Sequence, residues 1–329
     1  MTKVGISGLG AVGSQLLYRL QSRDDVDQVV LYDSEYEKLE KYIHQDIKKI
    51  QISTSPKMEQ SDIDILFLCT PAGQHLESAH RAVRQGISVI SASDRISDVV
   101  GILALDEAAK ENQCIAVAGA GFSPGLTCVL SSYTGDGFNV VDEIHIAKDG
   151  TGGPACARQH HRAMKRPSLD WRDGKWVRRP GGSGRELVWF PEPIGGADCY
   201  RAALPDAALL QPLFPTVSRI TARLSATRQD RFTSWLPMLT PPHNDGGIGA
   251  VRIEVRGDIN GCRETRVLGV TGPPSTISAI IAETCLEYMK SSSQYGSGGI
   301  ASFVPPKEFI ELVRQRGVKI LEFDGTPSF

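Results

Sequence analysis

The stretch KVGISGLGAVGSQLLYRL, residues 3–20, decides the fold of the first part of the chain. It begins with a short apolar run, continues with Gly8, Gly10 and Gly13, and ends with apolar residues at helical spacing. Strand, glycine turn and helix in this order are the context in which G-x-G-x-x-G marks a dinucleotide site. Gly8 makes the turn, Gly10 lets the pyrophosphate approach backbone amides, and Gly13 lets the helix pack on the sheet.

The next apolar run supports this interpretation. QVVLYDS (residues 28–34) predicts a buried strand that ends at Asp33, 20 residues after Gly13. A carboxylate at this place accepts hydrogen bonds from the ribose hydroxyls of NAD and repels the 2′-phosphate of NADP. We therefore expect NAD as the cofactor, with NADP as the alternative; Ser34 and Lys38 would then hold the phosphate.

Strands and helices continue to alternate up to residue 120. Apolar strands are predicted at 64–70, 87–93 and 114–120, separated by amphipathic helices at 72–86 and 102–112. This pattern is typical of an α/β, doubly wound Rossmann domain, in which ligands lie beyond the carboxyl ends of the strands. The predicted cofactor contacts are Gly8, Leu9, Gly10, Ala11, Val12, Gly13, Asp33, Ser34, Cys69, Thr70, Pro71 and Ser93.

The loops of this domain carry a family resemblance. LCTPAGQHLESAHRAVRQGISVISASD (68–94) and LDEAAKENQCIAVAGAGFSPGLTCVL (105–130) resemble the saccharopine dehydrogenase-like oxidoreductases and, more distantly, the diaminopimelate dehydrogenases. The resemblance covers residues 1–135 and, weakly, the last sixty. It implies a discontinuous Rossmann domain and the interconversion of an imine and an amine. Many of these sequences have Asp-Pro-Gly where this chain has Ser123-Pro124-Gly125, so the residue that would recognise a substrate amine is changed.

Two side chains are candidates for the chemical step. His75 follows the Cys-Thr-Pro turn by one helical turn, where a histidine commonly lies near the nicotinamide in related folds. Asp94 stands at the carboxyl end of a predicted strand, with an interaction with Arg95 as its alternative role. Cys69 and Cys128 are expected to be core thiols, because this chemistry needs no nucleophile.

Beyond residue 127 the pattern changes to a period near two. Segments 140–150, 185–190, 219–227, 249–260 and 262–272 predict an antiparallel sheet with one exposed face. We expect a Rossmann domain at 1–124, an α+β substrate and dimerisation domain at 125–270, and C-terminal helices at 271–329 that return to the first domain. The exposed face favours a homodimer.

The middle of the chain holds a cationic cluster, RQHHRAMKRPSLDWRDGKWVRRPGGSGR (158–185). Arg158, His161, Arg162 and Lys165 fall on one face of a predicted helix, where arginines suit a carboxylate. The outer cations are interpreted as a solvated loop. The predicted substrate contacts are Phe122, Ser123, Pro124, Gly125, Arg158, His161 and Arg162. They favour a small anionic, amino-acid-like substrate.

Composition excludes several classes of protein. The 329 residues have a formal net charge of -2 and one local basic cluster, which argues against a nucleic-acid binder. No apolar stretch is long enough for a membrane span, and we expect a cytoplasmic protein. The seven cysteines include no Cys-x-x-Cys pair, so neither disulfides nor a metal site is expected.

Three hypotheses follow. The first is an NAD(P)-dependent oxidoreductase that acts on the C–N bond of an amino acid or of an opine-like or saccharopine-like secondary amine. The second is a C–O oxidoreductase of the glucose-fructose oxidoreductase type; its usual Glu-Lys-Pro is replaced here by SASDRISD (91–98), which argues against it. The third is a dinucleotide-sensing protein without catalysis.

Overall fold

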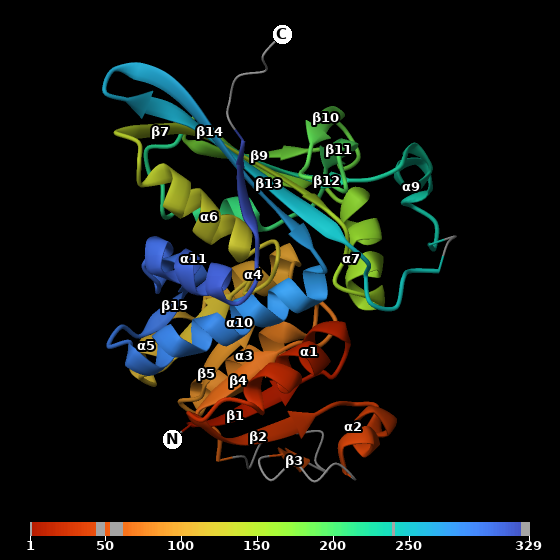
Figure 1. The fold of residues 1–329 in the computed structure, drawn as a ribbon, viewed down its shortest axis with the longest axis vertical. Coiled ribbons are helices and arrows are strands. Elements are labelled where there is room, and N and C mark those ends of the chain that lie inside the picture. Colours follow the sequence, from red (N-terminus) through yellow and green to blue (C-terminus); the bar gives the residue numbers. More distant parts are fainter. Residues whose placement is uncertain (1, 44–49, 53–61, 239–240, 324–329) are drawn as a thin grey trace.

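The computed structural model describes residues 2–43, 50–52, 62–238 and 241–323, and contains two sheets (Figure 1). The first sheet is parallel throughout its described strands. Its order is β15 (Gly296–Gly299), β6 (Ile115–Ala118), β5 (Ser88–Ser91), β4 (Ile65–Leu68), β1 (Thr2–Ser7), β2 (Val26–Tyr32) and β3 (Ile50–Ile52). The central strands are buried on both faces, which explains why they are apolar without interruption.

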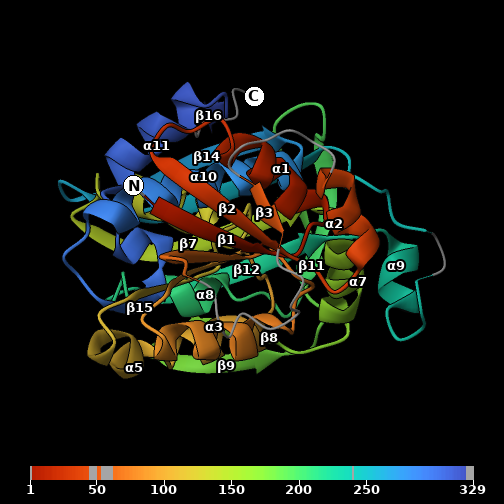
Figure 2. The same cartoon turned by 90° about the horizontal axis from the view of Figure 1, so that it is seen from below.

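Helices cover both faces of this sheet (Figure 2). On one side α1 (Ala11–Leu20) packs along α10 (Pro274–Ser291), and on the other lie α3 (His75–Arg84), α4 (Ile96–Leu103) and α5 (Asp106–Glu111). The remaining helices of the first domain are α2 (Tyr36–Ile43), the short 3₁₀ helix η1 (Ile300–Ser302) and α11 (Pro306–Gln315). The predicted doubly wound Rossmann domain is therefore confirmed.

The second sheet is mixed, whereas the sequence predicted an antiparallel one. Its order is β10 (Glu186–Trp189), β11 (Gly196–Arg201), β12 (Arg219–Ser225), β7 (Val140–Asp149), β13 (Gly249–Ile259), β14 (Cys262–Gly272) and β16 (Ile320–Phe323), with β8 (Ser168–Arg172) and β9 (Lys175–Arg179) attached at β12. β7 and β12 are parallel neighbours. The chain makes a long excursion through 150–218 between them, which allows it to re-enter the sheet in the same direction.

Three helices connect the two sheets or extend the second. They are α6 (Leu126–Gly135), α7 (Pro154–Met164) and α8 (Asp206–Leu210); α9 (Arg228–Thr233) lies farther out. α6 packs against both α11 of the first domain and β13 of the second, so one apolar core runs through both domains. Within the described part of the chain, every helix is too short or too polar to cross a lipid bilayer.

The C-terminal part divides between the two sheets. β15 pairs with β6 in the first sheet, as expected for a segment that returns to the Rossmann domain. β16 instead pairs with β14 in the second sheet, so the range 271–329 does not belong wholly to the first domain. The physical reason is that β14 would otherwise expose an unpaired edge.

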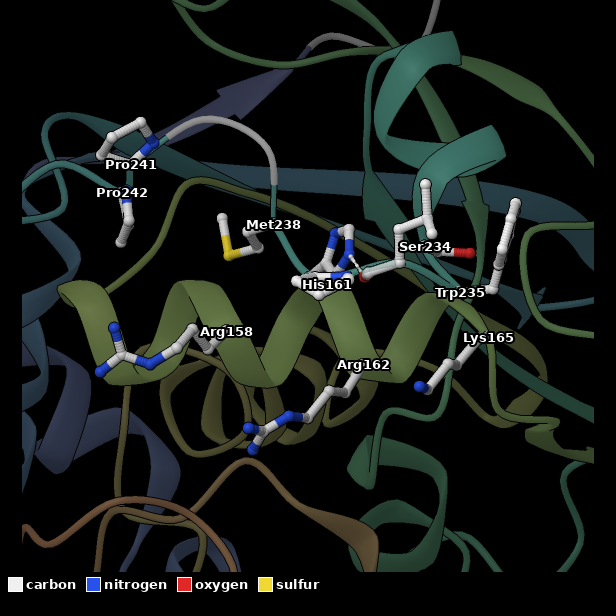
Figure 3. Close-up of a pocket in the computed structure, with 11 residues that line it drawn as sticks. Arg158, His161, Arg162, Lys165, Ser234, Trp235, Met238, Pro241 and Pro242 are labelled. Carbon is white, nitrogen blue, oxygen red and sulfur yellow. Dashed lines mark hydrogen bonds between the residues drawn. The ribbon is translucent and has the colours of Figure 1, made fainter.

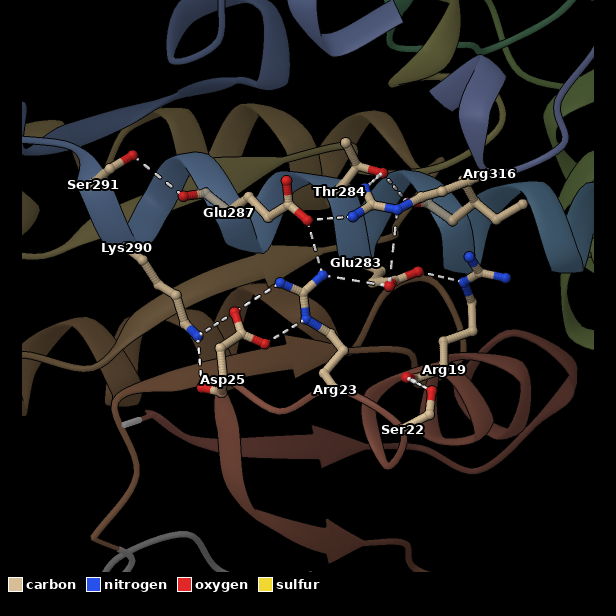
Figure 4. Close-up of polar contacts among 11 residues, drawn as sticks. Arg19, Ser22, Arg23, Asp25, Glu283, Thr284, Glu287, Lys290, Ser291 and Arg316 are labelled. Atoms are coloured by element: carbon tan, nitrogen blue, oxygen red, sulfur yellow. Dashed lines mark hydrogen bonds and ion pairs between the residues drawn. The ribbon is translucent and has the colours of Figure 1, made fainter. Parts of the chain in front are cut away.

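An ion-pair network attaches this returning segment to the start of the chain (Figure 4). Arg19 and Arg23 of the α1 region contact Glu283 of α10. Arg23 also pairs with Glu287 at 3.0 Å, and Glu287 contacts Arg316 beyond α11. Glu283 is only 8% exposed, so its charge is stabilised by these partners rather than by water.

Candidate functional site

The glycine loop between β1 and α1 has the shape that a dinucleotide needs. Gly8 has φ +96°, and a Cβ there would lie 2.6 Å from the backbone nitrogen of Thr70. A Cβ on Gly13 would lie 1.9 Å from the carbonyl oxygen of Gly8, so only glycine lets α1 pack this closely. A Cβ on Gly10 would meet nothing within 4 Å, because Gly10 borders an open cleft. This open space over backbone N–H groups at a helix N-terminus fits a pyrophosphate.

Asp33, directly after β2, connects to the same loop. Its Oδ2 accepts a hydrogen bond of 2.7 Å from the Leu9 N–H, and its Oδ1 accepts one of 2.9 Å from the Glu35 N–H. Both bonds hold the carboxylate at the end of the cleft next to β2. Lys38 also lines the cleft there but pairs with Glu35 at 2.8 Å.

The cleft has a volume of about 960 Å³ and brings most of the predicted cofactor contacts together. Leu9 and Gly13 lie behind its wall, where they shape the loop. The predicted contacts that line it are Gly8, Gly10, Ala11, Val12, Asp33, Ser34, Cys69, Thr70, Pro71 and Ser93. These residues fit a dinucleotide along the carboxyl ends of β1, β2 and β4.

His75 lies in the core and not on the wall of this cleft. Its side chain is 1% exposed, with Nδ1 2.9 Å from the Ser91 hydroxyl and Nε2 2.8 Å from the Thr70 carbonyl oxygen. Both ring nitrogens are thus engaged within the fold, and burial lowers the pKa of the ring although the Thr70 contact opposes this. The predicted chemical role of His75 has no support in this arrangement, which instead suits a residue that holds the Thr70 loop against β5.

Asp94, after β5, does line the cleft and meets two side chains of α7. Its Oδ2 is 2.8 Å from His160 Nε2 and 3.5 Å from Cys156 Sγ, and the latter two atoms are 3.4 Å apart (Asp94, Cys156 and His160 are called the Asp-Cys-His cluster below). Cys156 and His160 reach the same point because they are four residues apart on one helix. All three side chains line the cleft.

Lys148 of β7 adds a buried cation. Its ammonium donates a hydrogen bond of 2.9 Å to the Ser123 carbonyl oxygen and is 3.8 Å from Asp94 Oδ2. Burial alone would raise the pKa of Asp94, but the hydrogen bond with His160 and the charges of His160 and Lys148 lower it to about 2. Burial, followed by the charge of Asp94, raises the pKa of the Cys156 thiol to about 12.

A second buried carboxylate lies behind the GFSPG turn, residues 121–125. Phe122 and Ser123 line the cleft, whereas Pro124 and Gly125 support the turn. The Ser123 hydroxyl donates to Asp206 Oδ1 at 3.1 Å, and Thr127 donates to the same oxygen at 2.6 Å. Asp206 is 0% exposed, and burial raises the pKa of its carboxyl. The Asp206 carboxylate therefore lies directly behind Ser123, the residue that stands where many saccharopine dehydrogenase-like sequences have the Asp of Asp-Pro-Gly.

The cationic face of α7 lies mainly over a different cavity (Figure 3). Arg158, His161, Arg162 and Lys165 line a cavity of about 600 Å³, together with residues 234–238, Pro241 and Pro242. Arg158 alone of these four also lines the dinucleotide cleft. The helix face predicted from the sequence is correct, but only Arg158 is placed where it reaches the cleft.

The outer cations of the cluster lie on a hairpin, not in an irregular loop. β8 and β9 pair antiparallel, and Arg172, Lys175, Arg178 and Arg179 are exposed. Their exposure agrees with a solvated role.

Sequence patterns missed four residues of this site. Lys148 lies in segment 140–150, which is predicted only as part of the second sheet, and Asp206, Cys156 and His160 are not among the residues predicted for the site. A signal was present for the last two, because their i, i+4 spacing places them on one helix face. Their meeting with Asp94 depends on a contact between residues more than 60 positions apart.

Comparisons with known proteins agree with this architecture. Residues 3–113, about a third of the chain, match the family described as semialdehyde dehydrogenase, NAD binding domain. No curated protein sequence matches the chain.

Solved structures match nearly the whole chain at low identity. Saccharopine dehydrogenase (L-Glu forming) from Saccharomyces cerevisiae is 12% identical with a TM-score of 0.71, covering 98% of this chain and 100% of that one. Diaminopimelate dehydrogenase of C. glutamicum is 15% identical with a TM-score of 0.54, covering 95% of each chain. An amine dehydrogenase from Mycobacterium smegmatis is 12% identical with a TM-score of 0.55, covering 92% of this chain and 96% of that one.

The fold expected from the resemblance is thereby confirmed. The chain is similar to saccharopine and diaminopimelate dehydrogenases in fold, and its first domain is an NAD(P)-binding domain.

Proposed function

We propose that the protein is an NAD(P)-dependent oxidoreductase that acts on the C–N bond of an amino acid or of an opine-like or saccharopine-like secondary amine. The observation that carries the proposal is that Ser123, which lines the same cleft as the glycine loop, donates a hydrogen bond to the buried carboxylate of Asp206. The match to an NAD-binding domain and the likeness in fold to dehydrogenases of amino acids and amines support it.

The cofactor would supply the hydride chemistry, since a nicotinamide ring takes a hydride from, or gives one to, the carbon of a C–N bond. The glycine loop would hold the pyrophosphate, and Asp33 would accept hydrogen bonds from the adenosine ribose. Thr70 and Ser93 stand farther along the cleft. The carboxylate of Asp33 favours NAD, with NADP as the alternative.

Two cations would hold an anionic substrate in this cleft. Lys148 is 3% exposed, so its charge acts through a medium of lower effective dielectric than water. Arg158 stands at the border between the cleft and the neighbouring cavity and can offer paired N–H donors to a carboxylate. A small amino or keto acid fits these charges.

Ser123 and Asp206 would move the proton. When an amine is oxidised, its nitrogen loses one proton as the carbon loses a hydride. Ser123 Oγ can accept this proton while its own proton passes to Asp206 Oδ1, 3.1 Å away. Burial raises the pKa of Asp206, which makes it a better proton acceptor than an exposed carboxylate. In reduction the same proton returns.

The test is a substrate screen that follows NADH absorbance. Amino acids with NAD, and keto acids with NADH and an amine, should give turnover in the wild type and a strongly reduced kcat in Ser123→Ala. Glucose-type and other alcohol substrates serve as the control for C–O chemistry. Cofactor binding without turnover of any amine or keto acid would refute the proposal and favour the dinucleotide-sensing alternative.

The quaternary state and location remain predictions. A homodimer through the second sheet is favoured by the exposed Leu187 and Trp189 of β10, which are 58% and 64% exposed. Light scattering on the purified protein measures it directly. The cytoplasmic location is tested by fractionation.

A further inference from the structure

The Asp-Cys-His cluster combines three kinds of metal ligand at one point. Its ligand atoms are a carboxylate oxygen, a thiol sulfur and an imidazole nitrogen, and they all lie within 4.8 Å of one another. Asp94 is 9% exposed and His160 6%, so the cluster is not a chance meeting of mobile surface groups. Oxygen, nitrogen and sulfur together favour zinc or a similar transition metal over magnesium or calcium.

The distances fit a tetrahedral ion. With zinc bonds of about 2.3 Å to sulfur and about 2.0–2.2 Å to nitrogen and oxygen, the tetrahedral edges come to about 3.5–3.7 Å from sulfur and about 3.3–3.5 Å between nitrogen and oxygen. The observed Cys156–His160 and Cys156–Asp94 distances are 3.4 and 3.5 Å. The third edge, from His160 to Asp94, is 2.8 Å and would lengthen by about 0.5 Å to admit the ion.

The residues around the cluster provide the spacing and the charges that a metal site needs. Cys156 and His160 have the i, i+4 spacing by which two histidines of one helix bind zinc in H-E-x-x-H sites. His160 Nδ1 has no hydrogen-bond partner among the described residues, so no contact there prevents the ring proton from moving off Nε2. A thiolate and a carboxylate would neutralise a divalent ion, which leaves the charge of Lys148 for an anionic ligand.

We propose that Asp94, Cys156 and His160 bind one zinc ion, or a similar divalent transition metal, with a fourth coordination position open to the dinucleotide cleft. All three residues line that cleft, and three protein ligands with an open position are the arrangement of catalytic rather than structural zinc. The amino or carboxylate group of the substrate would take the open position; this last step rests on the proposed function, whereas the metal site does not.

Cobalt provides the test, because a tetrahedral Co²⁺ ion with a thiolate ligand has a charge-transfer band and intense d–d bands. Full-length protein treated with a chelator should bind one Co²⁺ per chain with both sets of bands. Cys156→Ser should abolish the charge-transfer band, and both Cys156→Ser and His160→Asn should weaken binding by at least about tenfold. The matched controls Cys262→Ser, at an exposed thiol, and His161→Asn, at the neighbouring histidine, should bind as the wild type does.

A second measurement covers the case in which a variant fails to fold. X-ray absorption of the wild-type zinc protein should show one sulfur at about 2.3 Å and nitrogen or oxygen at about 2.0–2.2 Å. Absence of stoichiometric cobalt bands, a charge-transfer band that persists in Cys156→Ser, or zinc without a sulfur neighbour would each overturn the proposal. Binding is measured without cofactor or substrate, so a failed substrate screen with intact cobalt bands would refute only the proposed function.

Discussion

Replacing Gly10 by Ala should separate cofactor binding from folding. Gly10 has φ −77° and ψ −162°, which alanine can adopt, and a Cβ there meets no atom within 4 Å. Alanine is a poorer N-cap than glycine but also reduces the conformational freedom of the unfolded chain, so the free energy of unfolding should change by no more than about 1 kcal/mol. The same methyl group would occupy the space into which the pyrophosphate must come to reach the backbone N–H groups.

The expected loss of affinity follows from the hydrogen bonds that are displaced. Losing one hydrogen bond to a charged group costs about 1.5–3 kcal/mol, and 1.4 kcal/mol corresponds to tenfold in Kd. The Kd for NADH, measured by fluorescence titration, should rise by about ten- to a hundredfold in Gly10→Ala. Thermal unfolding of the same variant should be nearly unchanged.

Gly13→Ala is the matched comparison, since its effect is on packing. Its Cβ would lie 1.9 Å from the Gly8 carbonyl oxygen, so α1 and the loop must separate by at least about 1 Å. We expect a loss of about 1–3 kcal/mol of stability, typical of overpacking, along with weaker NADH binding. The reasoning fails if Gly10→Ala binds NADH as tightly as the wild type, or if Gly10→Ala loses as much stability as Gly13→Ala.

Three further changes test other parts of the site. Asp33→Asn should weaken NADH binding and improve NADPH binding, because the 2′-phosphate is no longer repelled; an unchanged preference in titrations of both cofactors would contradict the assignment. Asp206→Asn keeps an amide oxygen that can accept the hydrogen bonds from Ser123 and Thr127, but it cannot take a proton, so kcat for amine oxidation should fall. Because burial raises the pKa of Asp206, wild-type kcat should rise with pH through that pKa, and the folded state should lose stability over the same range. The variant should lack both effects, and an identical pH profile would argue against the relay. Arg158→Ala should lower kcat/KM by about thirty- to a thousandfold, a loss of roughly 2 to 4 kcal/mol, with little change in NADH affinity. Arg178→Ala, at an exposed position of β9, is the control and should change kcat/KM by less than a few fold. Arg162→Ala shows whether the neighbouring cavity takes part in substrate binding. If Arg158→Ala and Arg162→Ala have effects as small as that of Arg178→Ala, α7 does not bind the substrate.

The parallel sheet and the dinucleotide site could be predicted from the sequence because their signals are local. The spacing of Gly8, Gly10, Gly13 and Asp33 lies within one strand-turn-helix-strand unit, and the buried strands are uninterrupted apolar runs. Each of these features depends on residues that are close in sequence, so neighbouring positions suffice to indicate it.

Only the tertiary structure decided which polar side chains meet. The sequence placed His75 near the chemistry, but the folded chain engages both of its ring nitrogens in the core. The amino-acid sequence does not indicate that Asp206 lies behind Ser123, 83 positions away, or that Asp94 of the first domain contacts His160 of the second. Helical spacing predicts which residues share a face of α7, but the packing of α7 against the Rossmann domain determines which face reaches the cleft. Contacts of this kind depend on how whole helices and strands pack against one another, and the pattern of neighbouring residues does not predict that packing.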